Sequence, residues 1–336
     1  MPAVAVADAL RADGHQVVFA GGQRAEAELV PAAGYELRAL NVEGISRSNP
    51  LKAARAVAKA ATALRTARRL LRAECPDVVM GGGGYVAGPV GAAAVLARIP
   101  LVLTEADSHL GLTNRALARF ARRVCLAFPI DGLTADRYRI TGRPVPPPVT
   151  DRAAARKRFG LADDDTCVLV FGGSLGAHSI NEAAIAAFAG ATFHVLHACG
   201  ARDYPALRDR VPSPTYDLRE YITPFGDALV ACDLCVARAG GSIFEIAAHG
   251  RPAILVPYPH AAADHQTANA DWMRRAGAAW VVPDAELSAE RLAREVGELL
   301  GDPGRLRAMG RASAALARPD AAQAIAGELL SAARER

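Results

Sequence analysis

Short apolar segments alternate with alanine-rich segments over most of this 336-residue chain. Several apolar segments, such as 168–171 and 254–256, contain no polar residue. A strand that is buried on both faces of a sheet requires this composition. The alanine-rich segments between them are long enough for helices. This alternation predicts an α/β fold in which helices cover both faces of parallel sheets.

The expected strands are 16–20, 77–80, 101–104, 123–127, 166–171, 193–198, 233–236, 253–256 and 278–282. The expected helices are 3–12, 51–73, 86–98, 113–121, 177–188, 242–249 and 265–276.

A proline-rich segment, Thr141–Thr150, divides the chain. It has four prolines in ten residues, which excludes a helix interior or a central strand. The charge changes here as well. Residues 1–150 hold 19 Lys+Arg and 12 Asp+Glu, whereas residues 151–336 hold 20 and 23. We therefore predict two doubly wound (Rossmann-like) parallel-sheet domains that face each other across a cleft, with bounds 1–142 and 143–316.

Glycine-rich turns follow three of the expected strands, in Gly81–Pro89, Gly172–Ala177 and Ala239–Ser242. Ligands of doubly wound sheets bind outside the carboxyl ends of the strands. Glycine also lets backbone N–H groups approach an oxyanion closely. After the third turn come an acid, Glu245, and a polar loop that spans 260–269. Such a segment suits a sugar nucleotide, because it offers donors for phosphate, a carboxylate for ribose and amides for a sugar.

Other chemistries are disfavoured. Gly82, Gly84 and Ala87 match the loose dinucleotide fingerprint, but they follow a later strand than that fingerprint requires. The chain has no Gly-Lys-Ser/Thr phosphate loop. Cys232 and Cys235 lack the further ligands of a metal site, so we expect buried structural thiols and no metal.

A basic segment, 50–72, has seven Lys or Arg residues and no acid. Two interpretations stand: a solvated helix face, or a surface for anionic lipid or a diphosphate-bearing substrate. Nucleic acid is disfavoured because aromatic residues make up 5% of the chain and none lies within this segment. We expect neither a signal peptide nor a membrane-spanning segment.

Taken in chain order, the motifs resemble those of the MurG-type glycosyltransferases of peptidoglycan synthesis. The matching segments are 83–89, 111–114, 141–145, 172–177, 238–242 with Glu245, and 259–269. The resemblance implies a glycosyltransferase-B fold and inverting transfer of N-acetylglucosamine from UDP-N-acetylglucosamine to lipid I, which gives lipid II. It also implies a peripheral protein on the cytoplasmic face of the cell membrane, with an anionic membrane surface and other cell-wall enzymes as partners and no required cofactor. The last helix, 317–336, is expected to pack on the N-terminal, acceptor-binding domain.

The resemblance also implies roles for single residues. For the donor, Ser174 contacts phosphate, Ile222 lines the uracil pocket, Glu245 binds ribose, and His265 and Gln266 contact the sugar hydroxyls. Gly240, Gly241, Asn269 and Arg143 complete the expected donor side. The expected acceptor side comprises Gly83, Gly84, Tyr85, Asp107 and Asn114. Simpler interpretations remain for Ser174, as a helix cap, and for Glu245, as a solvated helix residue.

The chain departs from the family pattern at its start, because Met1 aligns just before the proline that follows the family's first glycine-rich loop. The first strand and the usual candidate base, a histidine, are therefore missing from this sequence. Either translation starts further upstream or the acceptor chemistry is altered. Asp107 and His109 are base candidates by position only. Pro146 also replaces an expected arginine, for which Arg143 is the candidate substitute. Two rival functions remain open: transfer to another lipid or small-molecule acceptor, and a non-catalytic UDP-sugar-binding protein.

Overall fold

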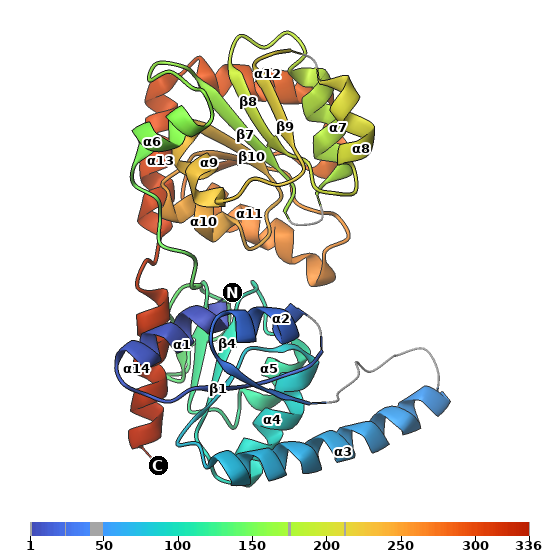
Figure 1. The fold of residues 1–336 in the computed structure, drawn as a ribbon, viewed down its shortest axis with the longest axis vertical. Coiled ribbons are helices and arrows are strands. Elements are labelled where there is room, and N and C mark those ends of the chain that lie inside the picture. The colour runs from blue at the N-terminus through green and yellow to red at the C-terminus, as the bar shows by residue number, and fades with distance from the viewer. Residues whose placement is uncertain (1, 24, 41–49, 174–175, 212, 336) are drawn as a thin grey trace. The chain divides into compact units, whose positions relative to one another are not determined.

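The computed structural model describes residues 2–23, 25–40, 50–173, 176–211 and 213–335, with the backbone alone for 50–61, 85 and 262. The chain forms two compact units, Met1–Val145 with Arg318–Arg336, and Pro146–Ala317 (Figure 1). The predicted boundaries at 142/143 and 316/317 lie close to these divisions. The proline-rich segment 141–150 has neither helix nor strand, as predicted.

The second unit is built on a six-stranded parallel sheet with the order β12-β11-β10-β7-β8-β9. Its strands are β7 (Cys167–Phe171), β8 (His194–Ala198), β9 (Tyr216–Arg219), β10 (Leu234–Ala237), β11 (Ala253–Leu255) and β12 (Ala279–Val281). Its helices are α6 (Arg152–Arg158), α7 (His178–Ala187), α8 (Tyr204–Leu207), α9 (Phe225–Ala231), α10 (Ile243–Ala248), α11 (His265–Arg275), α12 (Ala289–Leu300) and α13 (Pro303–Leu316), with short 3-10 turns at Arg208–Arg210, Ala262–Asp264 and Asp284–Glu286.

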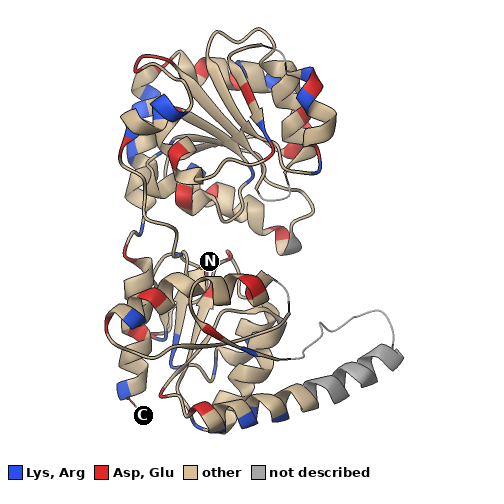
Figure 2. Ribbon diagram, viewed as in Figure 1, with Lys and Arg blue, Asp and Glu red and all other residues tan. Residues whose placement is uncertain are grey.

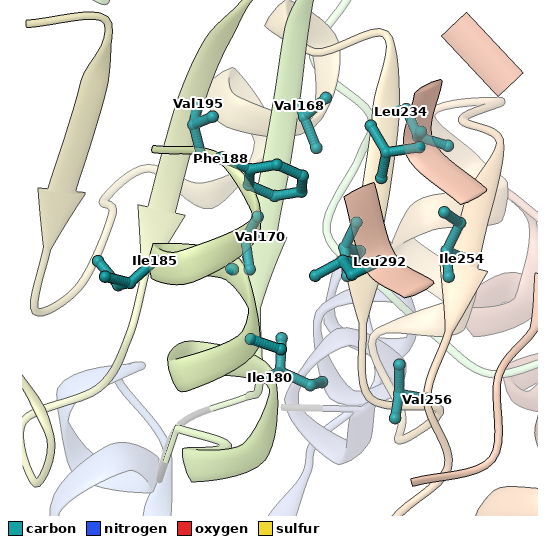
Figure 3. Packing of buried hydrophobic residues seen from close by; sticks show 14 of the residues in the cluster. Val168, Val170, Ile180, Ile185, Phe188, Val195, Leu234, Ile254, Val256 and Leu292 are labelled. Atoms are coloured by element: carbon teal, nitrogen blue, oxygen red, sulfur yellow. The ribbon is translucent and has the colours of Figure 1, made fainter. Parts of the chain in front are cut away.

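The core of the second unit lies between the sheet and helices α7 and α12. Val168 and Val170 on β7 point to the same face, as alternate residues of a strand do, and belong to one buried cluster with Ile180 and Phe188 (Figure 3). Leu292 closes this cluster from α12. Because β7 is buried along its whole length, its continuously apolar sequence is explained.

The first unit contains two parallel sheets. One pairs β1 (Val18–Gly21) with β2 (Glu36–Ala39), and the other has the order β3-β4-β5-β6. The second sheet consists of β3 (Val79–Gly81), β4 (Leu101–Glu105), β5 (Arg123–Leu126) and β6 (Tyr138–Ile140). The helices are α1 (Pro2–Ala12), α2 (Ala25–Ala32), α3 (Pro50–Glu74), α4 (Gly84–Leu96), α5 (Leu112–Leu117) and α14 (Ala321–Arg334). No ladder joins β1 to β3 among the described residues, so the strands of this unit do not form one continuous sheet.

The last helix, α14, belongs to the first unit although it ends the chain. Ile325 and Leu329 pack against Val6 of α1 and Val102 of β4. Arg123 of β5 forms an ion pair with Glu328 at 3.1 Å. Apolar packing and charge together hold α14 against this sheet.

The predicted α/β class is confirmed, and each expected strand is present with its ends shifted by a few residues. Three strands were not predicted: β2, β6 and β9. All three are edge strands in the described sheets, and each carries an arginine. Edge strands are partly solvated and do not need a continuous apolar sequence, so composition does not separate them from loops.

Candidate functional site

The carboxyl edge of the second unit's sheet brings together the glycine turn after β7, the turn 238–242 after β10 and the loop after β11. Helix α11 begins beside the last two. The Gln266 side chain accepts a hydrogen bond from the Tyr258 backbone N–H at 3.0 Å. Asn269 donates from Nδ2 to the Ala239 carbonyl at 2.9 Å. Two side chains of one helix thus hold both loops.

This geometry places three of the expected donor residues close to one another. A Cβ on Gly240 would lie 3.8 Å from Nε2 of Gln266, so the glycine turn and the amide are neighbours. Asn269 is 2% exposed, and its Oδ1 has no hydrogen-bond partner among the described residues. The structure therefore gives Asn269 a supporting position beneath the turn, whereas Gln266 is half-buried at its edge.

The remaining donor candidates lie around the same edge. Gly241 precedes α10, and the half-buried Glu245 is on that helix. His265 is the half-buried first residue of α11. Ile222 follows β9 and is 6% exposed. Ser174 lies outside the described residues.

The glycine turn after β7 is tight at both described ends. A Cβ on Gly172 would lie 2.3 Å from the Ala177 backbone N, and one on Gly176 would lie 2.1 Å from the Cys199 carbonyl O. Gly176 also has φ +73°. Only glycine fits these positions, and the turn is packed directly on the end of β8.

Arg238 supports this edge from inside. It is 8% exposed and donates to the carbonyls of Val256 and Pro257, at 3.1 and 3.2 Å, and to the Ser179 hydroxyl, at 2.8 Å. It also pairs with Asp284. A buried guanidinium with this many partners holds loops together and is not available for a ligand.

In the first unit, the acceptor-side candidates surround the carboxyl end of β4. Asn114 is 1% exposed and donates from Nδ2 to the Thr104 carbonyl and to Oε2 of Glu105, both at 2.9 Å. Gly83 and Gly84 have φ +76° and +77° at the start of α4. A Cβ on Gly83 would lie 3.6 Å from Nδ2 of Asn114, so the predicted glycines and this asparagine are neighbours. The Tyr85 side chain lies outside the described residues.

Glu105 organises the loop that carries the two base candidates. This carboxylate is 8% exposed and accepts from the backbone N–H groups of Ala106, Asp107 and Gly111, at 3.0, 3.2 and 2.8 Å. Asp107 is therefore fixed through its backbone. His109 is half-buried in the same loop, and its Nδ1 is buried without a partner among the described residues.

The sequence analysis did not assign a role to Glu105. A signal was available, because Glu105 is an acid at the end of an expected buried strand that has no other charged residue. A carboxylate is buried only where several hydrogen bonds stabilise its charge, so an acid at this position indicates a bonded role.

The other predicted features are more dispersed. Arg143 is half-buried in the first unit, after β6. Of the basic segment, Arg65, Arg68, Arg69 and Arg72 are described, and all are exposed on α3 (Figure 2). Lys52, Arg55 and Lys59 lie outside the described side chains. Cys232 and Cys235 are buried, with their sulfur atoms 3.6 Å apart. The described residues contain no cluster of His, Cys, Asp or Glu suited to a metal ion, and no described helix has the length and apolar composition to cross a membrane.

Solved structures with the same fold include the crystal structure of MurG from Acinetobacter baumannii, with a TM-score of 0.81, 29% sequence identity and coverage of 98% of this chain and 95% of that one. The fold is that of a glycosyltransferase with the glycosyltransferase-B architecture.

Two family descriptions match the chain: the glycosyltransferase family 28 N-terminal domain over residues 1–126, and the C-terminal domain of the same family over residues 167–325. The chain is 41% identical to the "UDP-N-acetylglucosamine--N-acetylmuramyl-(pentapeptide) pyrophosphoryl-undecaprenol N-acetylglucosamine transferase" of Moorella thermoacetica, over 96% of this chain and 93% of the relative. It is also 41% identical to the protein with that name in Rubrobacter xylanophilus, over 98% and 99%. The chain belongs to this family of glycosyltransferases, and the resemblance drawn from its motifs is confirmed.

Proposed function

We propose that this protein transfers N-acetylglucosamine from UDP-N-acetylglucosamine to lipid I, the undecaprenyl-diphospho-muramoylpentapeptide, and so forms lipid II. The observation that carries this proposal is the 41% identity over nearly the full length of relatives that bear this activity in their name. The grouping of Gly240, Gln266 and Asn269 at one sheet edge supports the donor half of the reaction.

In the proposed reaction, a hydroxyl oxygen of the acceptor sugar forms a bond to the anomeric carbon of N-acetylglucosamine. The bond from that carbon to the diphosphate oxygen breaks on the opposite face, so the configuration inverts. The hydroxyl proton passes to a base, and UDP leaves with the bonding electrons. Asp107 and His109 are the base candidates, since they share the loop that Glu105 holds.

The leaving diphosphate needs positive potential. The glycine turn before α7 offers backbone N–H groups at the start of a ten-residue helix, where the helix dipole favours an anion. We propose that this stabilisation operates without a tightly bound metal ion. Glu245 accepts from the ribose hydroxyls, Ile222 contacts the uracil, and Gln266 and His265 contact the sugar.

The test is turnover of UDP-N-acetylglucosamine with a lipid I analogue, with the disaccharide product separated by chromatography. Glu245→Ala should weaken UDP binding about 10- to 100-fold, as expected for hydrogen bonds to a carboxylate. Glu298→Ala, which removes an exposed acid from α12 of the same unit, is the matched control and should leave binding unchanged. If the protein binds the donor but forms no product from the lipid I analogue, the proposed acceptor is wrong. Equal UDP affinity in wild type and Glu245→Ala would remove the ribose assignment.

We also propose that the protein associates peripherally with the cytoplasmic face of the membrane through α3, whose described arginines are all exposed. Co-sedimentation with vesicles that contain anionic lipid should decrease as salt rises, because exposed charges are screened. Equal sedimentation with neutral vesicles would argue against a charge-driven contact.

A further inference from the structure

A buried polar chain runs through the second unit toward the carboxyl edge of its sheet. His197 of β8 is 0% exposed and lies between the Tyr216 hydroxyl, 2.7 Å from Nδ1, and the Asn181 side chain, 3.0 Å from Nε2. Asn181, also 0% exposed, donates from Nδ2 to the Cys199 carbonyl at 3.0 Å and to Oδ2 of Asp203 at 2.8 Å. The chain of bonds thus connects the interior to one carboxylate at the end of β8.

Asp203 in turn orients a cation. Arg202 donates from Nε to its Oδ1 at 2.9 Å and from Nη2 to its Oδ2 at 3.4 Å. His178, the first residue of α7, lies 3.4 Å from the same carboxylate. Asp203 is 10% exposed, whereas the Arg202 side chain is 63% exposed. The acid is therefore held by the protein, and the guanidinium is presented to solvent.

The segment that leads to Arg202 packs on the glycine turn after β7, at Cys199 and Gly200. The Cys199 carbonyl that Asn181 holds is the one that a Cβ on Gly176 would strike. On the other side, the pKa of Arg202 is raised chiefly by its hydrogen bond to Asp203, and Tyr258 adds a smaller contribution. Tyr258 follows β11, and its backbone is held by Gln266. Arg202 and Tyr258 thus follow β8 and β11, two strands on opposite sides of β7.

Two other arginines at this edge have further contacts besides their ion pair with an acid. Arg238 is buried among carbonyls, Ser179 and Asp284. Arg219 points both its Nε and its Nη2 at Asp217, and its guanidinium lies over the Phe159 ring. In the bonds found among the described residues, Arg202 uses only Nε and Nη2. A guanidinium has five N–H donors, so Nη1 remains for a ligand.

We propose that Arg202, oriented by Asp203, binds the diphosphate of the nucleotide-sugar donor beside the glycine turn after β7. The assignment rests on the proposed donor site. Arg202 belongs to the same unit as the glycine turn, whereas Arg143, the earlier candidate for this role, belongs to the other unit. Arginine is suited to this role because its planar fork matches phosphate oxygens, and a carboxylate partner fixes the orientation of the fork.

The experiment compares UDP with uridine, because only UDP carries the diphosphate. UDP affinity is measured by calorimetry and uridine affinity by ligand-observed NMR, on wild type, Arg202→Gln and Arg202→Lys. Arg202→Gln should lose about tenfold in UDP affinity, the worth of one charge-assisted hydrogen bond, and keep its uridine affinity. Arg202→Lys should retain part of the UDP affinity, since charge remains without the fork. Arg210→Gln is the matched control, because Arg210 is another exposed arginine paired with an acid, Glu182 on α7.

Three outcomes would overturn the assignment. If Arg202→Gln binds UDP as wild type does, Arg202 makes no contact with the diphosphate. If it loses UDP and uridine affinity equally, the substitution distorts the site as a whole. If wild type binds neither ligand, the proposed donor site fails and the assignment falls with it.

Discussion

His197 should make the second unit lose stability in acid. Burial lowers the pKa of His197 to about 3, from an ordinary value of 6.5. Nδ2 of Asn181 donates to two acceptors, the Cys199 carbonyl and Asp203 Oδ2, and this fixes the orientation of the amide. Oδ1 of Asn181 therefore faces the imidazole. The Nε2 of His197 therefore carries the proton, and Nδ1 accepts from Tyr216. The folded protein holds a neutral imidazole with both nitrogens satisfied.

The sign and size of the effect follow from linkage. Below pH 6.5 the His197 imidazole binds a proton in the unfolded chain, whereas in the folded chain it stays neutral down to about pH 3. Stability is therefore full above pH 6.5 and is lost as the pH falls through this window, by about 1.4 kcal/mol per unit. At pH 5, 1.5 units below the unfolded pKa, the loss from this residue is about 2 kcal/mol.

The assay is urea unfolding of wild type and His197→Gln at pH 7.5 and pH 5, followed by tryptophan fluorescence. Both tryptophans of the chain, Trp272 and Trp280, belong to the second unit, so the signal reports the unit that contains His197. His197→Gln should be the less stable protein at pH 7.5, because the network is cut. The gap between the two proteins should narrow by about 2 kcal/mol at pH 5. Other titrating groups, such as His249, cancel in this difference. A gap that stays the same at both pH values would refute the reasoning.

Three further predictions use the same protein. Gly176→Ala should lower both UDP affinity and thermal stability, because the position has φ +73° and a Cβ there would lie 2.1 Å from the Cys199 carbonyl; unchanged calorimetric binding and melting would show that the turn can move. Ser288→Ala should reduce the free energy of unfolding by about 1 kcal/mol, since its hydroxyl caps α12 by accepting from the Arg291 N–H at 3.1 Å; a change below 0.3 kcal/mol in urea unfolding would contradict the capping role. EDTA should leave the transfer rate unchanged in the lipid I assay; a loss that Mg²⁺ restores would show that the diphosphate needs a metal.

The sheet interior was predictable because burial on both faces leaves a clear composition. β7 is buried at every residue, and its apolar sequence identified it. β9 shows the opposite case. It is an edge strand in which Asp217 and Arg219 pair with each other, two residues apart on one face. The two charges pair within the strand, but a segment with this charged composition resembles a loop in the sequence.

The site divides in a similar way between local and distant contacts. Gly240, Gln266 and Asn269 were predicted together from one sequence segment and its family resemblance. They are neighbours in the structure because the helix after a short strand returns to the turn before that strand, within 30 residues of chain. Asn181, His197 and Asp203 were not predicted. Each belongs to a different segment, and they meet only because β8 pairs with β7 and α7 packs over both. The strand order is needed to bring these three residues together, so the sequence alone does not predict that they are neighbours.

Solvent exposure distinguishes Asn269 from Gln266, although both belong to one sequence motif. Asn269 and Gln266 belong to the same polar loop motif, and their side chains bond to neighbouring loops in the same manner. Asn269 is 2% exposed, so its amide can act on a ligand only through the Ala239 turn that it holds. Gln266 is half-buried beside Gly240 and can bond both to the loop and to a sugar. The motif thus identifies residues that hold this sheet edge together, and solvent exposure determines which of them could contact the proposed donor.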